Sequence, residues 1–131
     1  MRARHTDLRR IEMPLVVVWH KSGRFNNDMI QKLAETLPEI VAGALHVPES
    51  AEAHLAPDDI EVKVQESGKY DVNTKDLAII IWANLYPERL SNLTDRKDAI
   101  VQGVRAFLAD YDLKPSGFVW VLLQPAAFGE L

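Results

Sequence analysis

Cysteine is absent from the 131 residues, which excludes disulfide bonds, thiolate catalysis and cysteine-ligated zinc or iron–sulfur sites. No apolar run approaches the roughly 20 residues that a membrane-spanning helix needs. The histidines show neither H-x-H nor H-E-x-x-H spacing, so we expect no metal site. They are His5, His20, His46 and His54. Lysine and arginine total 15 against 19 acidic residues, so no basic field favours nucleic acid or an anionic membrane as partner. We expect a cytoplasmic location.

The chain has enough apolar residues, 47% of the total, for one globular core, and we expect a single domain over residues 13–131. The preceding residues, 1–12, contain four arginines and lack the apolar segment of a secretory signal. We interpret them as a polar leader. An alternative is that they are not native coding sequence, because Met13 and Pro14 stand directly before an apolar run and codons for Arg10-Ile11 can resemble a bacterial ribosome-binding site.

Four segments have the composition of β-strands. Three are continuous apolar runs, and the first two of these have the composition of strands covered on both faces. The fourth alternates apolar and polar residues, which is typical of a strand with one exposed face. The continuous runs are Pro14–Trp19, Leu77–Trp82 and Phe118–Leu123, and the alternating one is Ile60–Gln65.

Two segments between these strands have the apolar spacing of amphipathic helices. The first runs from a cap at Asn26 or Asn27 to about Leu45, and Pro38 inside it predicts a kink or a break. The second begins at Asn92 or Thr94. Its apolar face consists of Ile100, Val101, Val104, Phe107 and Leu108.

The two halves of the chain resemble each other. V-V-V-W at 16–19 matches I-I-I-W at 79–82, and a turn bearing one arginine follows each run. These arginines are Arg24 and Arg89, the second in a predicted loop over Asn84–Leu90. Each half then continues with a helix, a loop and a strand, so the pattern predicts β-α-β written twice.

The predicted architecture is therefore α+β, a two-layer sandwich with four main strands and two helices on one face of the sheet. The two β-α-β halves span about 14–65 and 77–124. One sheet face then carries no helix, although several strands have the composition of strands buried on both sides. We expect a partner subunit to cover that face.

A duplicated β-α-β chain whose first strand opens with Met-Pro resembles the tautomerase superfamily, which includes 4-oxalocrotonate tautomerase, 5-carboxymethyl-2-hydroxymuconate isomerase and macrophage migration inhibitory factor. The most specific part is P-L-V-V-V-W-H-K-S-G-R, residues Pro14–Arg24, where proline and arginine keep the ten-residue interval of the 4-oxalocrotonate branch. Arg89 follows the predicted third strand, where longer members place a participating arginine. The resemblance implies a homotrimer with pockets at subunit boundaries.

The activity that the resemblance implies is keto–enol tautomerisation of a small carboxylated enol or dienol without cofactor or metal. An N-terminal proline is a secondary amine that acts as a general base when neutral, and burial beside cations lowers its pKa toward 7. Pro14 takes that role, and Arg24 and Arg89 bind the substrate carboxylate and stabilise oxyanion charge. The expected substrate-binding residues are Asn84, Lys63, Trp120 and Phe128.

Simpler interpretations stay open for these residues. Arg24 and Arg89 are equally typical of solvated turns, Asn84 of a loop and Lys63 of an ion pair with Glu61. The tryptophans are expected in the core or at a subunit interface. They are Trp19, Trp82 and Trp120.

Two alternative functions follow from the same residues. In the chain as printed, Pro14 is internal, and its nitrogen is a tertiary amide with no useful basicity. A leader that packs on the domain would favour a non-catalytic oligomeric binding module. A dehalogenase or decarboxylase on the same scaffold would need an extra carboxylate near Pro14, for which Asp58, Asp59 and Glu61 are the candidates.

Overall fold

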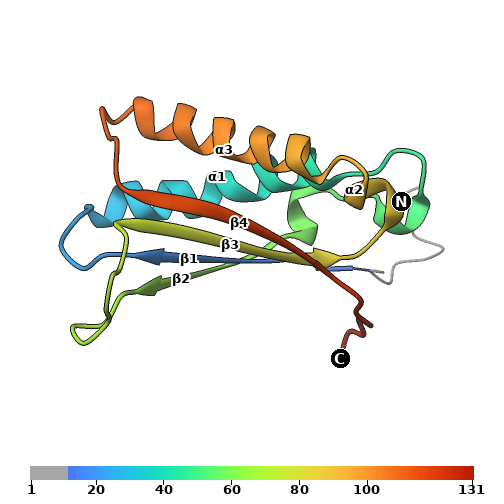
Figure 1. Cartoon of the computed structure of the whole chain (residues 1–131), viewed down its shortest axis with the longest axis horizontal. Coiled ribbons are helices and arrows are strands. Elements are labelled where there is room, and N and C mark those ends of the chain that lie inside the picture. The colour runs from blue at the N-terminus through green and yellow to red at the C-terminus, as the bar shows by residue number, and fades with distance from the viewer. Residues whose placement is uncertain (1–11) are drawn as a thin grey trace.

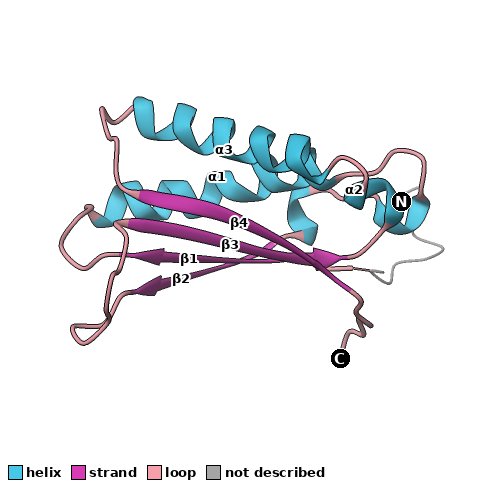
Figure 2. Cartoon of the chain, viewed as in Figure 1, coloured by secondary structure: helices cyan, strands magenta, loops and turns pink. Residues whose placement is uncertain are grey.

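The computed structural model describes residues 12–131. Most of the predicted leader, residues 1–11, lies outside the described residues, whereas Glu12 lies within them. The chain forms a four-stranded sheet with two long helices packed on one face (Figures 1 and 2). This two-layer α+β arrangement confirms the predicted architecture.

The sheet has the strand order β2-β1-β3-β4. β1 pairs in parallel with β2 and β3 pairs in parallel with β4, while the two central strands run antiparallel. Each parallel pair with its crossover helix is one β-α-β unit, so the sheet joins two such units edge to edge. The strands are β1 (Leu15–His20), β2 (Glu61–Glu66), β3 (Leu77–Asn84) and β4 (Gly117–Gln124).

The helix-facing side of the sheet forms the hydrophobic core. Burial alternates along β3, with each buried residue followed by a partly exposed one, because successive side chains point to opposite faces. Val16 and Val18 of β1 and Ile79 and Ile81 of β3 are almost completely buried beneath the helices. At the start of β4, Gly117 is required, because a Cβ there would lie 1.9 Å from the Leu77 carbonyl oxygen.

The two long helices are α1 (Asn27–Leu45) and α3 (Leu93–Ala109). Asn26 caps α1, since its side-chain oxygen accepts a hydrogen bond from the Met29 N–H at 2.8 Å. α1 is one uninterrupted helix through Pro38, so the predicted break is absent. Packing of the α1 apolar face on the sheet compensates for the one backbone hydrogen bond that proline cannot donate. Asn92 is at the N-cap of α3 but makes no side-chain capping bond.

The predicted loop over Asn84–Leu90 is replaced by ordered structure. β3 continues through Asn84, and a short helix, α2 (Pro87–Leu90), follows at once. Pro87 occupies the first turn of α2, where a missing N–H costs nothing and the fixed φ suits a helix. As a result Arg89 lies on a helix, close to the end of β3. No helix within the described residues has the length and apolarity of a membrane span.

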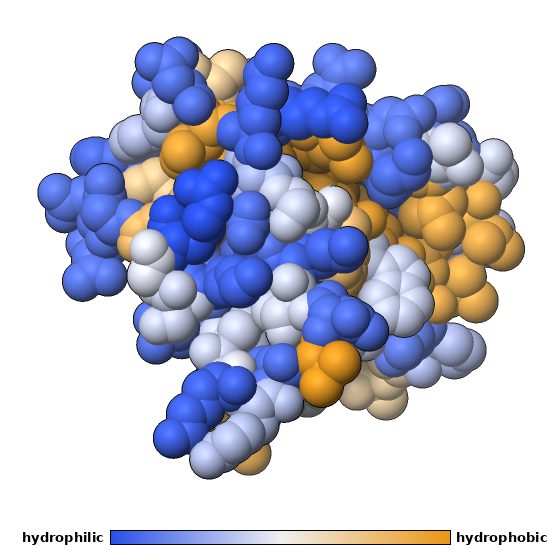
Figure 3. All heavy atoms as spheres, turned by 60° about the vertical axis from the view of Figure 1, so that its left-hand side comes forward, coloured by the Kyte–Doolittle hydropathy of each residue, from blue (hydrophilic) through white to orange (hydrophobic). Residues whose placement is uncertain are grey.

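The sheet face opposite the helices carries large apolar side chains, and we call it the open face. Register places Val17, Ile80 and Trp120 side by side across three strands on this face. Trp120 is 55% exposed on this face. One side of the molecule shows a broad apolar area beside hydrophilic side chains (Figure 3). The apolar open-face residues are Leu15, Val17, Trp19, Ala78, Ile80, Trp82, Phe118, Trp120 and Leu122.

Candidate active site

Pro14 lines a small cavity where β1 begins and β3 ends. Pro14 is buried, and the cavity has a volume of about 180 Å³. Asn84 reaches it from the last position of β3, and Phe128 reaches it from the segment after β4. The fold therefore brings together three of the residues predicted from the sequence, because β1 and β3 are antiparallel neighbours and the start of one meets the end of the other.

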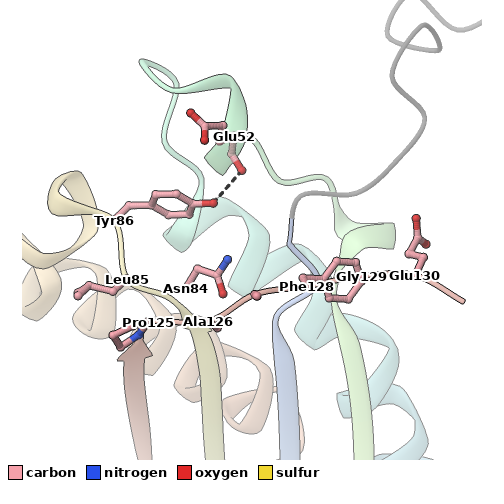
Figure 4. Close-up of a pocket in the computed structure, with 10 residues that line it drawn as sticks. Glu52, Asn84, Leu85, Tyr86, Pro125, Ala126, Phe128, Gly129 and Glu130 are labelled. Atoms are coloured by element: carbon pink, nitrogen blue, oxygen red, sulfur yellow. Dashed lines mark hydrogen bonds between the residues drawn. The ribbon is translucent and has the colours of Figure 1, made fainter.

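A larger cavity of about 820 Å³ lies beside the first and shares Asn84 and Phe128 with it. Tyr86 and Glu52 form part of its wall, and the Tyr86 hydroxyl donates a hydrogen bond to the Glu52 carbonyl oxygen at 3.2 Å (Figure 4). In Figure 4 Asn84 lies between Tyr86 and Phe128. The larger cavity therefore adjoins the one that Pro14 lines.

Arg89 is completely buried and is paired with Glu12, the residue two positions before Pro14. Glu12 Oε2 accepts hydrogen bonds from Arg89 Nη1 at 2.7 Å and from the Asn84 N–H at 2.5 Å. The two side chains are 0% and 2% exposed. Within the described residues, Glu12 Oε1 and Arg89 Nη2 have no hydrogen-bond partner. Glu12 is not predictable from the sequence, because it lies 77 residues from its partner and no local pattern connects them.

Arg89 also has a structural function at the end of α1. Its Nε donates to the Leu45 carbonyl oxygen at 2.9 Å, and Arg96 Nη1 donates to the Ala44 and His46 carbonyl oxygens at 3.0 Å. The last turn of α1 has no basic residue, so these arginines satisfy its free carbonyls and its partial negative charge. Desolvation, followed by repulsion from Arg89, lowers the pKa of Arg96.

Arg24 is at the other end of the sheet from Pro14. It follows the C-terminal end of β1, whereas Pro14 precedes the N-terminal end (Figure 1). A six-residue strand spans about 20 Å. Arg24 Nε donates to Asp76 Oδ2 at 3.2 Å, and the same oxygen accepts from the Ser116 N–H at 3.1 Å. Within one chain, Arg24 and Arg89 therefore do not share a site.

The interactions at Asp76 predict a pH-dependent contribution to stability. The Ser116 N–H and, after an opposing desolvation effect, the Arg24 guanidinium hold the pKa of Asp76 below its ordinary value of 3.8. A lowered folded-state pKa stabilises the protein above 3.8, and this contribution disappears as pH falls through the lowered value. We expect Asp76→Asn to lower the urea midpoint at pH 7 and to match wild type at strongly acid pH. Glu39→Gln, which changes an exposed residue of α1, is the control. If the difference in urea midpoint between Asp76→Asn and wild type were as large at acid pH as at pH 7, the Asp76 carboxylate would not be the source of the stabilisation.

Two other predicted substrate-binding residues lie outside both cavities. Lys63 Nζ pairs with Glu61 Oε2 at 3.3 Å, as the simpler interpretation expected. Trp120 is on the open face, as is Trp19, so neither is a core residue of the single chain. Asp59 is buried and accepts a hydrogen bond from the Ala56 N–H at 2.8 Å. The described residues contain no group of three metal-ligating side chains.

Comparison with known proteins identifies the fold. No protein-family model and no curated protein matches the sequence. Solved structures do match over most of the chain. A fused 4-OT described as an asymmetric trimer is 16% identical with a TM-score of 0.58, and the match covers 88% of this chain and 91% of that one. Malonate semialdehyde decarboxylase is 14% identical with a TM-score of 0.57 over the same shares. The chain has the tautomerase-superfamily fold.

A third match extends this likeness to another branch of the tautomerase-superfamily fold. A macrophage migration inhibitory factor-like protein from Entamoeba histolytica is 8% identical with a TM-score of 0.55, and the match covers 88% of this chain and 90% of that one. The resemblance found in the sequence is confirmed at the level of the fold. At these identities the matches carry no residue roles, so the function must be argued from the site.

Proposed function

We propose that the domain beginning at Pro14 moves a proton in a small carboxylated enol or dienol, with the proline amine as general base. The observation that carries this proposal is that Pro14 is buried at the start of β1 and lines a cavity with Asn84 and Phe128. Solved structures with this fold include a fused 4-OT and malonate semialdehyde decarboxylase, which supports an enzymatic function for this scaffold.

The chemistry requires that Pro14 have a free secondary amine. An α-amino group has an ordinary pKa of about 7.7–8.0, and burial lowers it by disfavouring the charged form. The neutral amine then takes a proton from the enol hydroxyl and returns it to carbon. The closed ring of proline also restricts the direction of the lone pair.

Arg89 and Asn84 are the proposed substrate-binding groups of the same chain. Arg89 Nη1 and the Asn84 N–H already bind one carboxylate oxygen, that of Glu12, so they have the geometry to bind another. Arg24 lies at the opposite end of β1 and can contribute only if it enters the site of a neighbouring protomer. Phe128 supplies an apolar part of the cavity wall.

For the full chain as printed, in which residues 1–13 are still attached, we propose a different function. Glu12 packs into the domain and Pro14 is an amide, which favours the non-catalytic binding module for the uncleaved protein. The decarboxylase or dehalogenase alternative has less support, because Asp58, Asp59 and Glu61 are not among the residues that line the Pro14 cavity. Tautomerisation needs no additional carboxylate.

The test of the proposed function compares two chains that differ only in their start. We expect a chain whose mass corresponds to residues 14–131 to catalyse ketonisation of phenylenolpyruvate, and the full chain to be inactive. Equal turnover by both chains would contradict a proline base. Intact-mass measurement on protein expressed from its own promoter shows which form the cell contains.

We further propose that the domain assembles as a homotrimer through the open face. Apolar side chains of three strands lie exposed together there, and 4-OT proteins of the same fold are described as trimers. Trp120, at 55% exposed, has the largest surface to lose to a partner.

Replacing one open-face residue with a charge should weaken this assembly. Trp120→Glu would bury an unpaired carboxylate, which costs about 3–5 kcal/mol and corresponds to an association roughly 100-fold weaker or more. Sedimentation velocity should show a trimer for wild type and mainly monomer for the variant. Gln102→Glu adds the same charge on the exposed side of α3 and should leave the mass unchanged. A trimer that survives Trp120→Glu would place the interface elsewhere.

A further inference from the structure

Glu12 contacts Arg89 in the way that a bound carboxylate ligand contacts its binding site. A single carboxylate oxygen, Glu12 Oε2, accepts from both Arg89 Nη1 and the Asn84 N–H. Glu12 also forms part of the wall of the Pro14 cavity, whereas its partner Arg89 is completely buried and does not line that cavity. The site therefore has a charged donor and a backbone donor that converge on one anion.

Glu12 uses only part of what this site offers. Arg89 Nη2 is buried and donates to no described residue, and Glu12 Oε1 accepts from none. A guanidinium binds a carboxylate best through two parallel N–H···O bonds, one from each side of its fork. The backbone attachment of Glu12 holds its carboxylate against Nη1 alone. A free carboxylate has no such attachment and can turn to engage Nη1 and Nη2 together.

The position of Glu12 in the chain links this site to the amine. Hydrolysis of the Met13–Pro14 peptide bond consumes one water and leaves a carboxylate on Met13 and a secondary amine on Pro14. Any event that makes Pro14 the N-terminus also removes Glu12, which lies two residues earlier. Arg89 then loses its counter-ion while it remains held by the Leu45 and Asn84 carbonyl oxygens.

We propose that Glu12 is an internal plug of a small-carboxylate site formed by Arg89 and the Asn84 N–H, and that removal of residues 1–13 opens this site and creates the Pro14 amine in one event. The inference rests on the proposed function, because it assigns the regulation of the same site. The full chain is thereby blocked twice, at the base and at the anion site.

Acetate is the probe, because Glu12→Ala deletes a group of the size of acetate. In the full chain carrying Glu12→Ala, we expect sodium acetate to raise the Tm saturably, by on the order of 3–6 °C, relative to sodium chloride of equal ionic strength. Glu12→Gln removes the charge but leaves the site filled, so acetate and chloride should act alike on it and on wild type. Arg89→Met added to Glu12→Ala should abolish the acetate effect.

Other results would overturn the plug. These are an equal response of Glu12→Ala to acetate and chloride, or an equal response of Glu12→Ala and Glu12→Gln to acetate. If Glu12→Ala fails to fold, the readout is the yield of soluble protein refolded from urea in either salt. A higher yield in acetate supports the site and an equal yield overturns it.

The same proteins separate this inference from the proposed function. Full-chain Glu12→Ala should bind acetate without catalysing tautomerisation, because Pro14 is still an amide. If acetate stabilises Glu12→Ala but the chain beginning at Pro14 has no activity, the anion site stands and the proposed function fails. If the chain beginning at Pro14 is active, but acetate stabilises neither that chain nor full-chain Glu12→Ala, the plug fails and the proposed function stands.

Discussion

Retaining Met13 on the chain that otherwise begins at Pro14 is expected to lower kcat/KM for phenylenolpyruvate by about 10²–10⁴. This one residue converts the proline amine into an amide, which has no basic lone pair. It also adds its side chain to the wall of the Pro14 cavity, while the Arg89 site is the same in both chains. Glu12 is absent from both chains, so the comparison isolates the base from the anion site. Absorbance assays of phenylenolpyruvate ketonisation measure kcat/KM for the two proteins, after intact mass has verified where each chain begins.

Pro14→Ala in the chain beginning at residue 14 is the companion variant. It keeps an N-terminal amine but loses the ring that restricts its orientation, so we expect a clear loss of kcat/KM with the fold intact. The rate of the chain beginning at Pro14 should increase with pH as the proline amine deprotonates. Full activity of the Met13-containing chain would mean that a group other than the Pro14 nitrogen takes the proton. Full activity of Pro14→Ala would mean that the proline ring is not required.

Arg89→Met in the full chain is expected to lower the free energy of unfolding by about 3–5 kcal/mol. The substitution leaves the Glu12 carboxylate buried without its cation and removes the hydrogen bonds to the Leu45 and Asn84 carbonyl oxygens. Glu12→Gln should cost less, about 1–3 kcal/mol, because an amide oxygen can still accept from Arg89 and the Asn84 N–H. Urea denaturation with a common m-value measures both losses.

The exposed pair Lys97–Asp98 provides the control for the buried pair. Its side chains are 40% and 54% exposed, so Lys97→Met should change stability by no more than roughly 0.5 kcal/mol. In a double-mutant cycle, Glu12→Gln and Arg89→Met should not be additive, since both remove the same contact. Additive losses, or an Arg89→Met loss as small as that of Lys97→Met, would mean that the pair is not coupled as the structure describes.

Most of the fold could be predicted because its signals are local. Continuous β-branched runs and one alternating run identified the four strands, and apolar spacing identified both long helices. The duplication of strand and helix then implied the two parallel pairs. The short helix α2 was missed, because four residues are too few to show helical periodicity and Pro87 is equally typical of a turn. The break predicted at Pro38 is absent, because packing of α1 on the sheet outweighs the local tendency of proline to interrupt a helix.

The candidate site was only partly predictable. Pro14, Asn84 and Phe128 were identified and lie on one cavity, whereas Lys63 and Trp120 lie on another face of the molecule. The matched turns that contain the two arginines are real repeats in sequence. They follow strands that run in opposite directions, however, so the repeat places the arginines at opposite ends of the sheet.

By itself, the sequence determined the strands, the helices, the repeated unit and the apolar character of a face that carries no helix, because each of these follows from the period of side chains along a short segment. Only the tertiary structure decided that Arg89 is buried, that Glu12 neutralises it and that both adjoin Pro14. Desolvation and ion pairing depend on which distant segments meet in space, and the pairing of residue 12 with residue 89 exists only after β1 has docked against β3.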